Sequence, residues 1–156
     1  MAKTKFCQGI SDISDSYAGF ILDQWGVIHN GEEAYEGAVE CLKELRARNK
    51  YIIILSNSGK RSDVNKENLR KMGVGPSLYD VIVTSGELTW QGLKDQKEGV
   101  FQKLGTRCFL ISRGGDRSII EGLDIQVVDD IKDADFLLIS GSDAPHKNMM
   151  DDYEPI

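Results

Sequence analysis

The chain has 156 residues, 40% of them hydrophobic and 28% charged, with a formal net charge of −6. This length is sufficient for a domain with a substantial core, and the acidic balance argues against a nucleic-acid or anionic-membrane partner held by bulk charge. The longest apolar runs are far shorter than a membrane span, and no signal peptide is visible in the opening MAKTKFCQG. Three widely spaced cysteines without a CxxC motif argue against a disulfide framework and a thiolate metal site, and they fit a reducing cytoplasm.

After a polar lead-in over residues 1–17, the first predicted strand is the short apolar run Phe20–Leu22, which ends on Asp23. Such a run is typical of a parallel sheet with both faces covered. Asn30 and Gly31 lie between two further segments, and this dipeptide predicts a small hairpin flap directly after the acid. An acid at the carboxyl end of a buried strand lies where open α/β sheets bind their ligands, although Asp23 taken alone fits an ordinary turn residue equally well.

An amphipathic helix follows, because apolar residues recur at helical spacing at Ala38, Cys41, Leu42 and Leu45. Asn49 is its expected C-cap. The unbroken run Tyr51–Leu55 is the clearest buried strand of the chain, and it ends on Ser56 and Asn57. A strand, a helix and a parallel strand form a right-handed unit almost without exception. We therefore expect Asp23 and Ser56 at the same edge of one sheet.

The remaining elements alternate between helix and strand. The expected ranges are helices over Ser62–Met72 and Gly86–Lys94, and strands over Val81–Thr84, Arg107–Ile111, Gln126–Val128 and Phe136–Ser140. Thr84 and Glu87 have the spacing of a capping box. The segment Arg113–Asp116 lacks a phosphate-loop pattern and is interpreted as a plain turn. Residues 148–156 resemble the beginning of a helix.

Two motifs stand at the ends of the first two strands, LDQWGV over Leu22–Val27 and LSNS over Leu55–Ser58. In this order they resemble the haloacid dehalogenase (HAD) superfamily of aspartyl phosphotransferases, and in detail its class IIA, NagD-like branch. The resemblance covers about residues 18–156. It implies an α/β fold, with the N-terminal part of a HAD-like (Rossmannoid) parallel-sheet core over residues 18–104 and the start of a class IIA α/β cap over 105–156.

The resemblance also implies a Mg²⁺-dependent hydrolase that acts on small phosphorylated metabolites through an aspartyl-phosphate intermediate. Asp23 is then the nucleophile. One of its carboxylate oxygens, together with the backbone carbonyl of Trp25, is expected to bind Mg²⁺. The Ser56 hydroxyl and the Asn57 backbone N–H are expected to hold the phosphoryl oxygens.

Two features depart from the family pattern. The usual acid/base aspartate, two residues after the nucleophile, is replaced by Trp25, which cannot exchange a proton at neutral pH and is interpreted as a stacking platform or a packing residue. His29 offers a substitute, although an exposed flap histidine is the preferred interpretation. The family's later lysine and acidic pair have no match in this sequence. Lys60 is interpreted as a surface residue, and the acidic pair Asp151 and Asp152 does not follow a core strand.

These departures lead to expectations for the chain by itself. We expect an incomplete core, a truncated form of a longer enzyme in preference to a natural short paralogue, and little activity from the 156 residues alone. An exposed sheet edge favours a homo-oligomer. The alternative function is a non-catalytic metabolite-binding or assembly module, a pseudo-enzyme with Trp25 in place of the acid/base residue.

Overall fold

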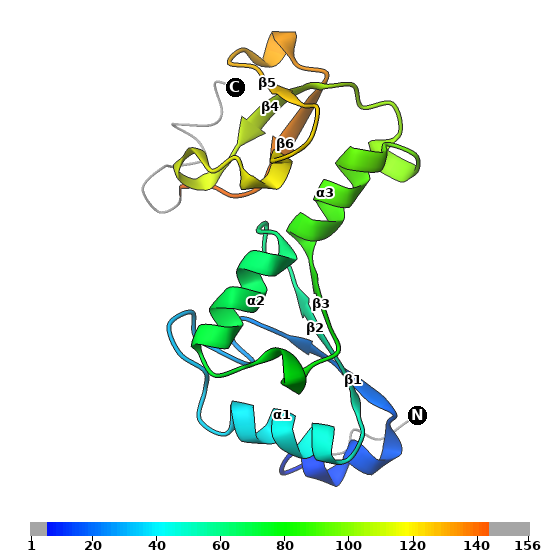
Figure 1. Cartoon of the computed structure of the whole chain (residues 1–156), viewed down its shortest axis with the longest axis vertical. Helices are drawn as coiled ribbons and strands as arrows, with labels where there is room; N and C mark the ends of the chain where they lie inside the picture. Colours follow the sequence, from blue (N-terminus) through cyan, green and yellow to red (C-terminus); the bar gives the residue numbers. More distant parts are fainter. Residues whose placement is uncertain (1–5, 144–156) are drawn as a thin grey trace. The chain divides into compact units, whose positions relative to one another are not determined.

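The computed structural model of the protein describes residues 6–143. They form two compact units, the first made of residues 6–56 and 65–83 and the second of residues 57–64 and 84–143. Each unit contains its own parallel β-sheet (Figure 1). The α/β fold with parallel sheets, expected from the sequence, is confirmed, whereas the domain boundaries at residues 17/18 and 104/105 stay predictions. No described helix is long and apolar enough to cross a membrane.

The first unit is built on a three-stranded sheet with the order β1-β2-β3. Its elements are β1 (Gly19–Asp23), α1 (Ala38–Ala47), β2 (Tyr51–Ser56), most of α2 (Ser62–Lys71) and β3 (Val81–Thr84). Short 3₁₀ turns lie at Ile10–Asp12, Ser14–Ser16 and Pro76–Leu78. These bounds agree with the predicted elements to within about two residues.

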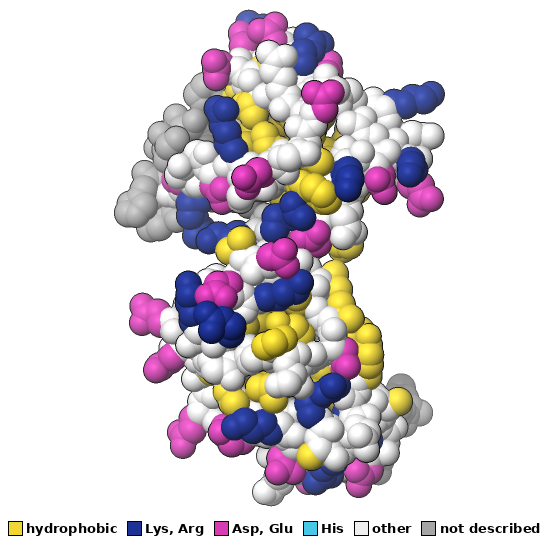
Figure 2. Space-filling view, in the orientation of Figure 1, with side chains coloured by type: hydrophobic (Ala, Val, Ile, Leu, Met, Phe, Trp, Pro, Cys, Tyr) yellow, Lys and Arg dark blue, Asp and Glu magenta, His cyan; other side chains and the backbone are white. Residues whose placement is uncertain are grey.

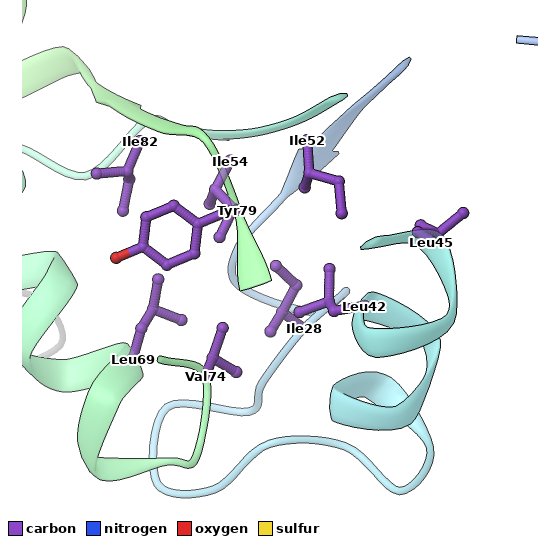
Figure 3. Packing of buried hydrophobic residues seen from close by; sticks show 9 residues of the cluster. All are labelled: Ile28, Leu42, Leu45, Ile52, Ile54, Leu69, Val74, Tyr79 and Ile82. Carbon is purple, nitrogen blue, oxygen red and sulfur yellow. The ribbon is translucent and has the colours of Figure 1, made fainter. Parts of the chain in front are cut away.

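The core of this unit lies between one face of the sheet and helices α1 and α2 (Figure 3). Ile52 and Ile54 of β2 are completely buried, and Leu42 of α1 and Leu69 of α2 pack in the same cluster. Alternate residues of a strand point to opposite faces of a sheet. The apolar stripe of α1, predicted from Ala38 to Leu45, therefore packs only against the strand residues that point to this face of the sheet.

The opposite face of the sheet is apolar and exposed. Side chains of all three strands contribute to this face, with exposed fractions of 66% for Ile21, 50% for Tyr51, 48% for Leu55 and 38% for Val81. Figure 2 shows hydrophobic side chains gathered along this flank of the unit. The expectation that the first strand is buried on both faces was wrong, because no described helix covers this second face.

The predicted flap is a tight loop with isolated bridges in place of a regular hairpin. His29 bridges to Trp25 on one side and to Ala34 on the other. The Asn30 side chain accepts hydrogen bonds from the backbone N–H groups of Glu32 and Glu33, both at 2.9 Å. An asparagine that binds the backbone two or three residues ahead forms a local turn. This explains why Asn-Gly here closes a loop and does not join two long strands.

The second unit has a three-stranded parallel sheet with the order β5-β4-β6. Its elements are α3 (Ser85–Asp95), β4 (Arg107–Ile111), β5 (Gln126–Val127) and β6 (Phe136–Ile139), with 3₁₀ turns at Gly99–Phe101, Arg113–Gly115, Ser118–Ile120 and Ile131–Asp133. Leu93 of α3 packs with Ile119 and Ile120 to form a separate apolar cluster. The helix predicted from residue 148 lies outside the described residues.

Candidate active site

The predicted nucleophile and the predicted phosphoryl-binding serine lie at adjacent strand ends. Strands β1 and β2 are parallel, and their register pairs Asp23 with Leu55. Ser56 is the next residue of β2, so both polar side chains come from the carboxyl edge of the same sheet, where α/β folds bind ligands. Asp23 is exposed, whereas Ser56 is buried. Asn57 follows Ser56 directly and is exposed.

The carboxylate of Asp23 is oriented by the chain that follows it. Its Oδ1 accepts a hydrogen bond from the Gln24 backbone N–H at 2.7 Å. No donor among residues 6–143 binds the other oxygen, Oδ2. A carboxylate held through one oxygen presents the second to solvent. This arrangement suits a nucleophile or a metal ligand.

Trp25 projects its indole from the loop with 64% of the residue exposed. The indole lies directly against Gly31, where a Cβ atom would collide with the ring. Gly31 also has φ of 106°, a conformation that side chains with a Cβ rarely adopt. The Trp25 carbonyl accepts no hydrogen bond from the described residues, so this oxygen is available to a cation.

His29 is buried, with 4% of the residue exposed. Its Nδ1 accepts a hydrogen bond from the Gly31 backbone N–H at 2.9 Å, and its Nε2 lies 3.0 Å from Nε2 of Gln24. Burial lowers the pKa of His29 below its usual value. The interpretation of His29 as an exposed flap histidine was therefore wrong. The residue is a neutral support of the loop, and its ring nitrogens already have partners.

The contact between His29 and Gln24 also fixes a tautomer. Because Nδ1 accepts a hydrogen bond, the neutral ring carries its proton on Nε2, and that N–H needs an acceptor. The Gln24 amide supplies one if its oxygen faces the ring. In the opposite orientation Gln24 Oε1 is buried without a hydrogen-bond partner. Amide orientations are assigned from such networks. Gln24 Nε2 also donates to Asn65 Oδ1 at 3.3 Å, so placing Oε1 against His29 requires the Asn65 amide to turn as well.

The loop after the second motif is fastened to the first turn of α3. The Thr84 hydroxyl donates to the Lys60 carbonyl at 2.9 Å and accepts from the Glu87 backbone N–H at 3.1 Å. The Gly86 backbone N–H donates to the Ser58 carbonyl at 3.0 Å. A Cβ atom on Gly86 would collide with the carbonyls of Gly59 and Lys60. Glycine is therefore required where this helix and this loop meet.

Glu87 also attaches this loop to α3, through side-chain contacts that the capping-box spacing did not predict. Its carboxylate binds Arg61 through Nε at 2.8 Å and through a terminal nitrogen at 3.2 Å. The Ser62 backbone N–H and hydroxyl each donate to it at 3.1 Å. The hydrogen bond from Arg61 is the main cause that lowers the pKa of Glu87 to about 2, and the hydrogen bonds from Ser62 lower it further. The Arg61 guanidinium also lies 3.8 Å above the Trp90 ring.

Magnesium needs several oxygen ligands and usually keeps some of its waters. One carboxylate oxygen of Asp23 and the Trp25 carbonyl are two suitable oxygens on one short segment, which leaves the other carboxylate oxygen for nucleophilic attack. Within the described part of the chain, no group of three acidic, histidine or cysteine side chains is close enough to hold a metal ion. These residues therefore fit one side of a hydrated Mg²⁺ site. Asp151 and Asp152 lie outside the described residues.

Together these features define a parallel α/β protein with an exposed carboxylate and a buried serine at adjacent strand ends of one sheet. The model of the haloacid dehalogenase-like hydrolases matches residues 20–126. The chain belongs to this family, and its likeness to the NagD-like class IIA branch is confirmed.

Among known proteins, the chain is similar to the sugar-phosphatase AraL of Bacillus subtilis (strain 168). The two are 31% identical over 133 residues, which cover 83% of this chain and 45% of AraL. A haloacid dehalogenase-like hydrolase from Brucella suis 1330 has a similar structure, with 29% identity, a TM-score of 0.73 and coverage of 88% of this chain and 47% of that one. The 4-nitrophenylphosphatase of Thermotoga maritima is 26% identical, with a TM-score of 0.58, and the match covers 81% of this chain and 46% of that protein. The chain thus spans about half the length of these relatives.

Proposed function

We propose that the protein is a phosphatase of small phosphorylated metabolites that uses Asp23 as its nucleophile. The observation that carries the proposal is the pairing of β1 with β2, in which an exposed carboxylate and a serine stand at adjacent parallel strand ends. The curated relative AraL is a sugar-phosphatase, which supports a phosphorylated sugar or sugar derivative as substrate. Because the chain spans about half of such relatives, the activity is proposed for the protein together with the rest of a catalytic core.

In the first step, Oδ2 of Asp23 attacks phosphorus, and the bond from phosphorus to the leaving oxygen breaks as the new O–P bond forms. The Ser56 hydroxyl and the Asn57 N–H donate to the phosphoryl oxygens, where negative charge develops. A water then attacks phosphorus, which releases inorganic phosphate and restores the Asp23 carboxylate. Bound Mg²⁺, held by Asp23 and the Trp25 carbonyl, would supply positive charge against the phosphoryl oxygens.

The leaving oxygen takes its proton from solvent in this mechanism. Trp25 has no exchangeable proton at neutral pH, and His29 is buried with both ring nitrogens engaged. General acid/base catalysis typically contributes about 10²–10⁴-fold. We therefore expect aryl phosphates, whose leaving groups need little protonation, to be hydrolysed faster than alkyl phosphates by a similar factor.

The decisive experiment tests for the covalent intermediate in the complete gene product and in the 156-residue chain. The protein is incubated with Mg²⁺ and 4-nitrophenyl phosphate, quenched in acid, and examined by peptide mass spectrometry for a phosphorylated Asp23. Asp23→Asn should abolish both the modification and turnover. The matched control Asp129→Asn, which changes an exposed aspartate, should leave both unchanged. Full activity in Asp23→Asn would refute the proposed mechanism.

A second candidate function is a non-catalytic metabolite-binding or assembly module. Its support is Trp25 at the position of the usual acid/base residue. This function predicts phosphate binding at Ser56 without turnover. Detection of phospho-Asp23 in the complete protein would exclude it.

We also propose that the isolated chain self-associates through its exposed sheet, and that the protein works in the cytoplasm. The support for self-association is the uncovered apolar face, which includes the edge-strand residue Ile21. Parallel sheets usually have both faces covered. Sedimentation of the purified chain over a range of concentrations tests the proposed self-association, and a monomer at all concentrations would argue against it.

A further inference from the structure

Asn30 and Gly31 form the only Asn-Gly dipeptide of the sequence, and they lie in the tight loop after Trp25. In such a pair the backbone nitrogen of glycine can attack the side-chain amide of asparagine, because glycine has no Cβ atom to obstruct a close approach. The product is a five-membered succinimide ring, which water opens to aspartate or isoaspartate. The reaction needs a polarised amide carbonyl, an activated nitrogen and access to water.

The side-chain carbonyl of Asn30 is held by two hydrogen-bond donors. Its Oδ1 accepts from the backbone N–H groups of Glu32 and Glu33, both at 2.9 Å. When a nitrogen attacks Cγ, negative charge develops on this same oxygen. Preorganised backbone N–H groups aimed at such an oxygen are the means by which enzymes stabilise the tetrahedral intermediate of acyl transfer. The hydrogen bonds that shape the turn therefore also polarise the amide.

The attacking nitrogen of Gly31 is in contact with a base. Its N–H donates to Nδ1 of His29 at 2.9 Å, which is within the reach expected of a general base. Because Nδ1 accepts this bond, it is the unprotonated nitrogen of the ring. The N–H bond lies in the peptide plane, whereas attack on Cγ uses the nitrogen orbital perpendicular to that plane. The base and the Asn30 amide can therefore act on this nitrogen together.

The loop holds these groups in place and leaves the amide open to water. His29 is buried, and its backbone carbonyl accepts from the Gly26 N–H at 2.9 Å. The Asn30 backbone N–H donates to the Glu33 carbonyl at 3.1 Å. Asn30 itself is exposed, so ammonia can leave and water can enter. Groups that are already in position lose less entropy at the moment of attack.

The shape of the loop also retains the reactive dipeptide. Gly31 has φ of 106°, and the Trp25 indole occupies the space that a Cβ atom would need. A residue with a side chain, which would slow attack by its own nitrogen, is therefore poorly tolerated at this position.

We propose that Asn30 is a self-modification site, at which the folded loop converts asparagine to aspartate and isoaspartate. The Gly31 nitrogen forms a bond to Asn30 Cγ as its proton passes to His29 Nδ1. The bond from Cγ to the amide nitrogen then breaks, that nitrogen takes the proton back from His29, and ammonia leaves. Water adds to either carbonyl carbon of the succinimide and opens the ring. Water is the only other reactant, and the reaction does not involve Asp23.

The products change the loop that carries the Trp25 carbonyl. The succinimide nitrogen has no hydrogen, so the hydrogen bond from Gly31 to His29 is lost when the ring forms. Isoaspartate adds a carbon atom to the backbone, and both open products place a new carboxylate at position 30. Modification therefore produces an aged form of the chain in which this loop is altered.

The test compares the rate of modification in the folded and the unfolded states of the full 156-residue chain. Samples are kept in neutral buffer with or without guanidinium chloride, digested under mildly acidic conditions and examined by peptide mass spectrometry. The succinimide peptide is lighter by the mass of ammonia, and chromatography separates the aspartate and isoaspartate forms. We expect Asn30 to react about tenfold or more faster in the folded chain, since general-base catalysis typically contributes at least this much. An equal or slower rate in the folded chain would overturn the proposal.

His29→Gln retains an acceptor for the Gly31 N–H but offers no base, so modification in the folded chain should slow about tenfold or more. Glu32→Gln is the matched control, because it removes a neighbouring charge and keeps the backbone N–H that binds Asn30 Oδ1. This control should react at the natural rate. A folded His29→Gln chain that reacts like Glu32→Gln would also contradict the proposal. If His29→Gln fails to fold, the comparison of the two states of the natural chain still decides.

Discussion

His29 Nδ1 accepts a hydrogen bond from the Gly31 backbone N–H at 2.9 Å, and this contact ties the imidazole ring to the backbone two residues further along the loop. The ring must be neutral at Nδ1 to accept it. His29, which its position in the sequence suggested as a substitute acid, therefore supports the loop instead. The proton that the leaving group needs must come from elsewhere.

The buried His29 makes stability depend on pH in a defined direction. Its folded pKa lies below the unfolded value of 6.5, because burial disfavours the charged ring. The unfolded chain therefore binds the proton first, so this contribution to stability is fully present above about pH 6.5 and is lost as pH falls toward the folded pKa.

His29→Asn keeps an acceptor near Nδ1 but cannot be protonated. We expect the variant to be less stable at pH 7.5 by about 1–2 kcal/mol, through lost packing. Its decline in stability between pH 7 and pH 5 should be shallower than that of the natural chain. Urea unfolding at four pH values measures this difference, and parallel pH curves would contradict the assignment.

Gly31→Ala should destabilise the chain through two separate effects. The residue has φ of 106°, and the new Cβ would meet the Trp25 indole. Backbone strain of this kind costs about 1–3 kcal/mol. Gly26→Ala is the control for strain, since its φ is 79° and a Cβ atom added there would meet nothing within 4 Å. Thermal unfolding should show the larger loss for Gly31→Ala, and adding Trp25→Ala should recover part of it.

Glu87→Gln should loosen the attachment of the second-motif loop to α3. The pKa of Glu87 is about 2, below its ordinary 4.5, so its stabilisation is present above pH 4.5 and is lost as pH falls toward 2. We expect a loss of about 2 kcal/mol at pH 7. The difference from the natural chain should shrink on acidification. Glu98→Gln, at an exposed position, should change neither quantity, and a constant difference at all pH values would point to packing alone.

Ile21→Lys tests the exposed apolar face of the first sheet. Ile21 lies on the edge strand β1 with 66% of the residue exposed, so a lysine there costs little in folding and places charge on the face. We expect weaker self-association and less binding of the dye ANS. Val100→Lys, at a position 80% exposed in the second unit, should leave both unchanged. Equal effects of the two substitutions would assign the change to net charge.

The sequence was a good guide wherever structure depends on neighbouring residues. The run Tyr51–Leu55 predicted β2, and the spacing of Thr84 and Glu87 predicted the first turn of α3, where the threonine does accept from the Glu87 N–H. The polar ends of β1 and β2 predicted that Asp23 and Ser56 share a sheet edge, and the observed register agrees. Periodicity and strand ends are local properties, which a sequence displays directly.

Other features depend on residues that are distant in the chain. Nothing near Glu87 indicates that its carboxylate binds Arg61, 26 positions earlier. The burial of His29 follows from the Gln24 and Gly31 contacts that the loop creates on folding. The exposure of Ile21 depends on which face the helices cover, and an apolar strand of this length gives no sign of that choice.

The close packing around Gly59 and Gly86 limits the substitutions that the chain can tolerate at these positions. Added carbon atoms at these two positions would meet backbone carbonyls, those of Ser140 for Gly59 and of Gly59 and Lys60 for Gly86. Backbone cannot move aside as the end of a flexible side chain can. A saturation mutagenesis screen should therefore find both positions nearly invariant, although neither has a side chain that could take part in chemistry. In an alignment of homologues, invariance of these two glycines would reflect the steric requirements of the loop.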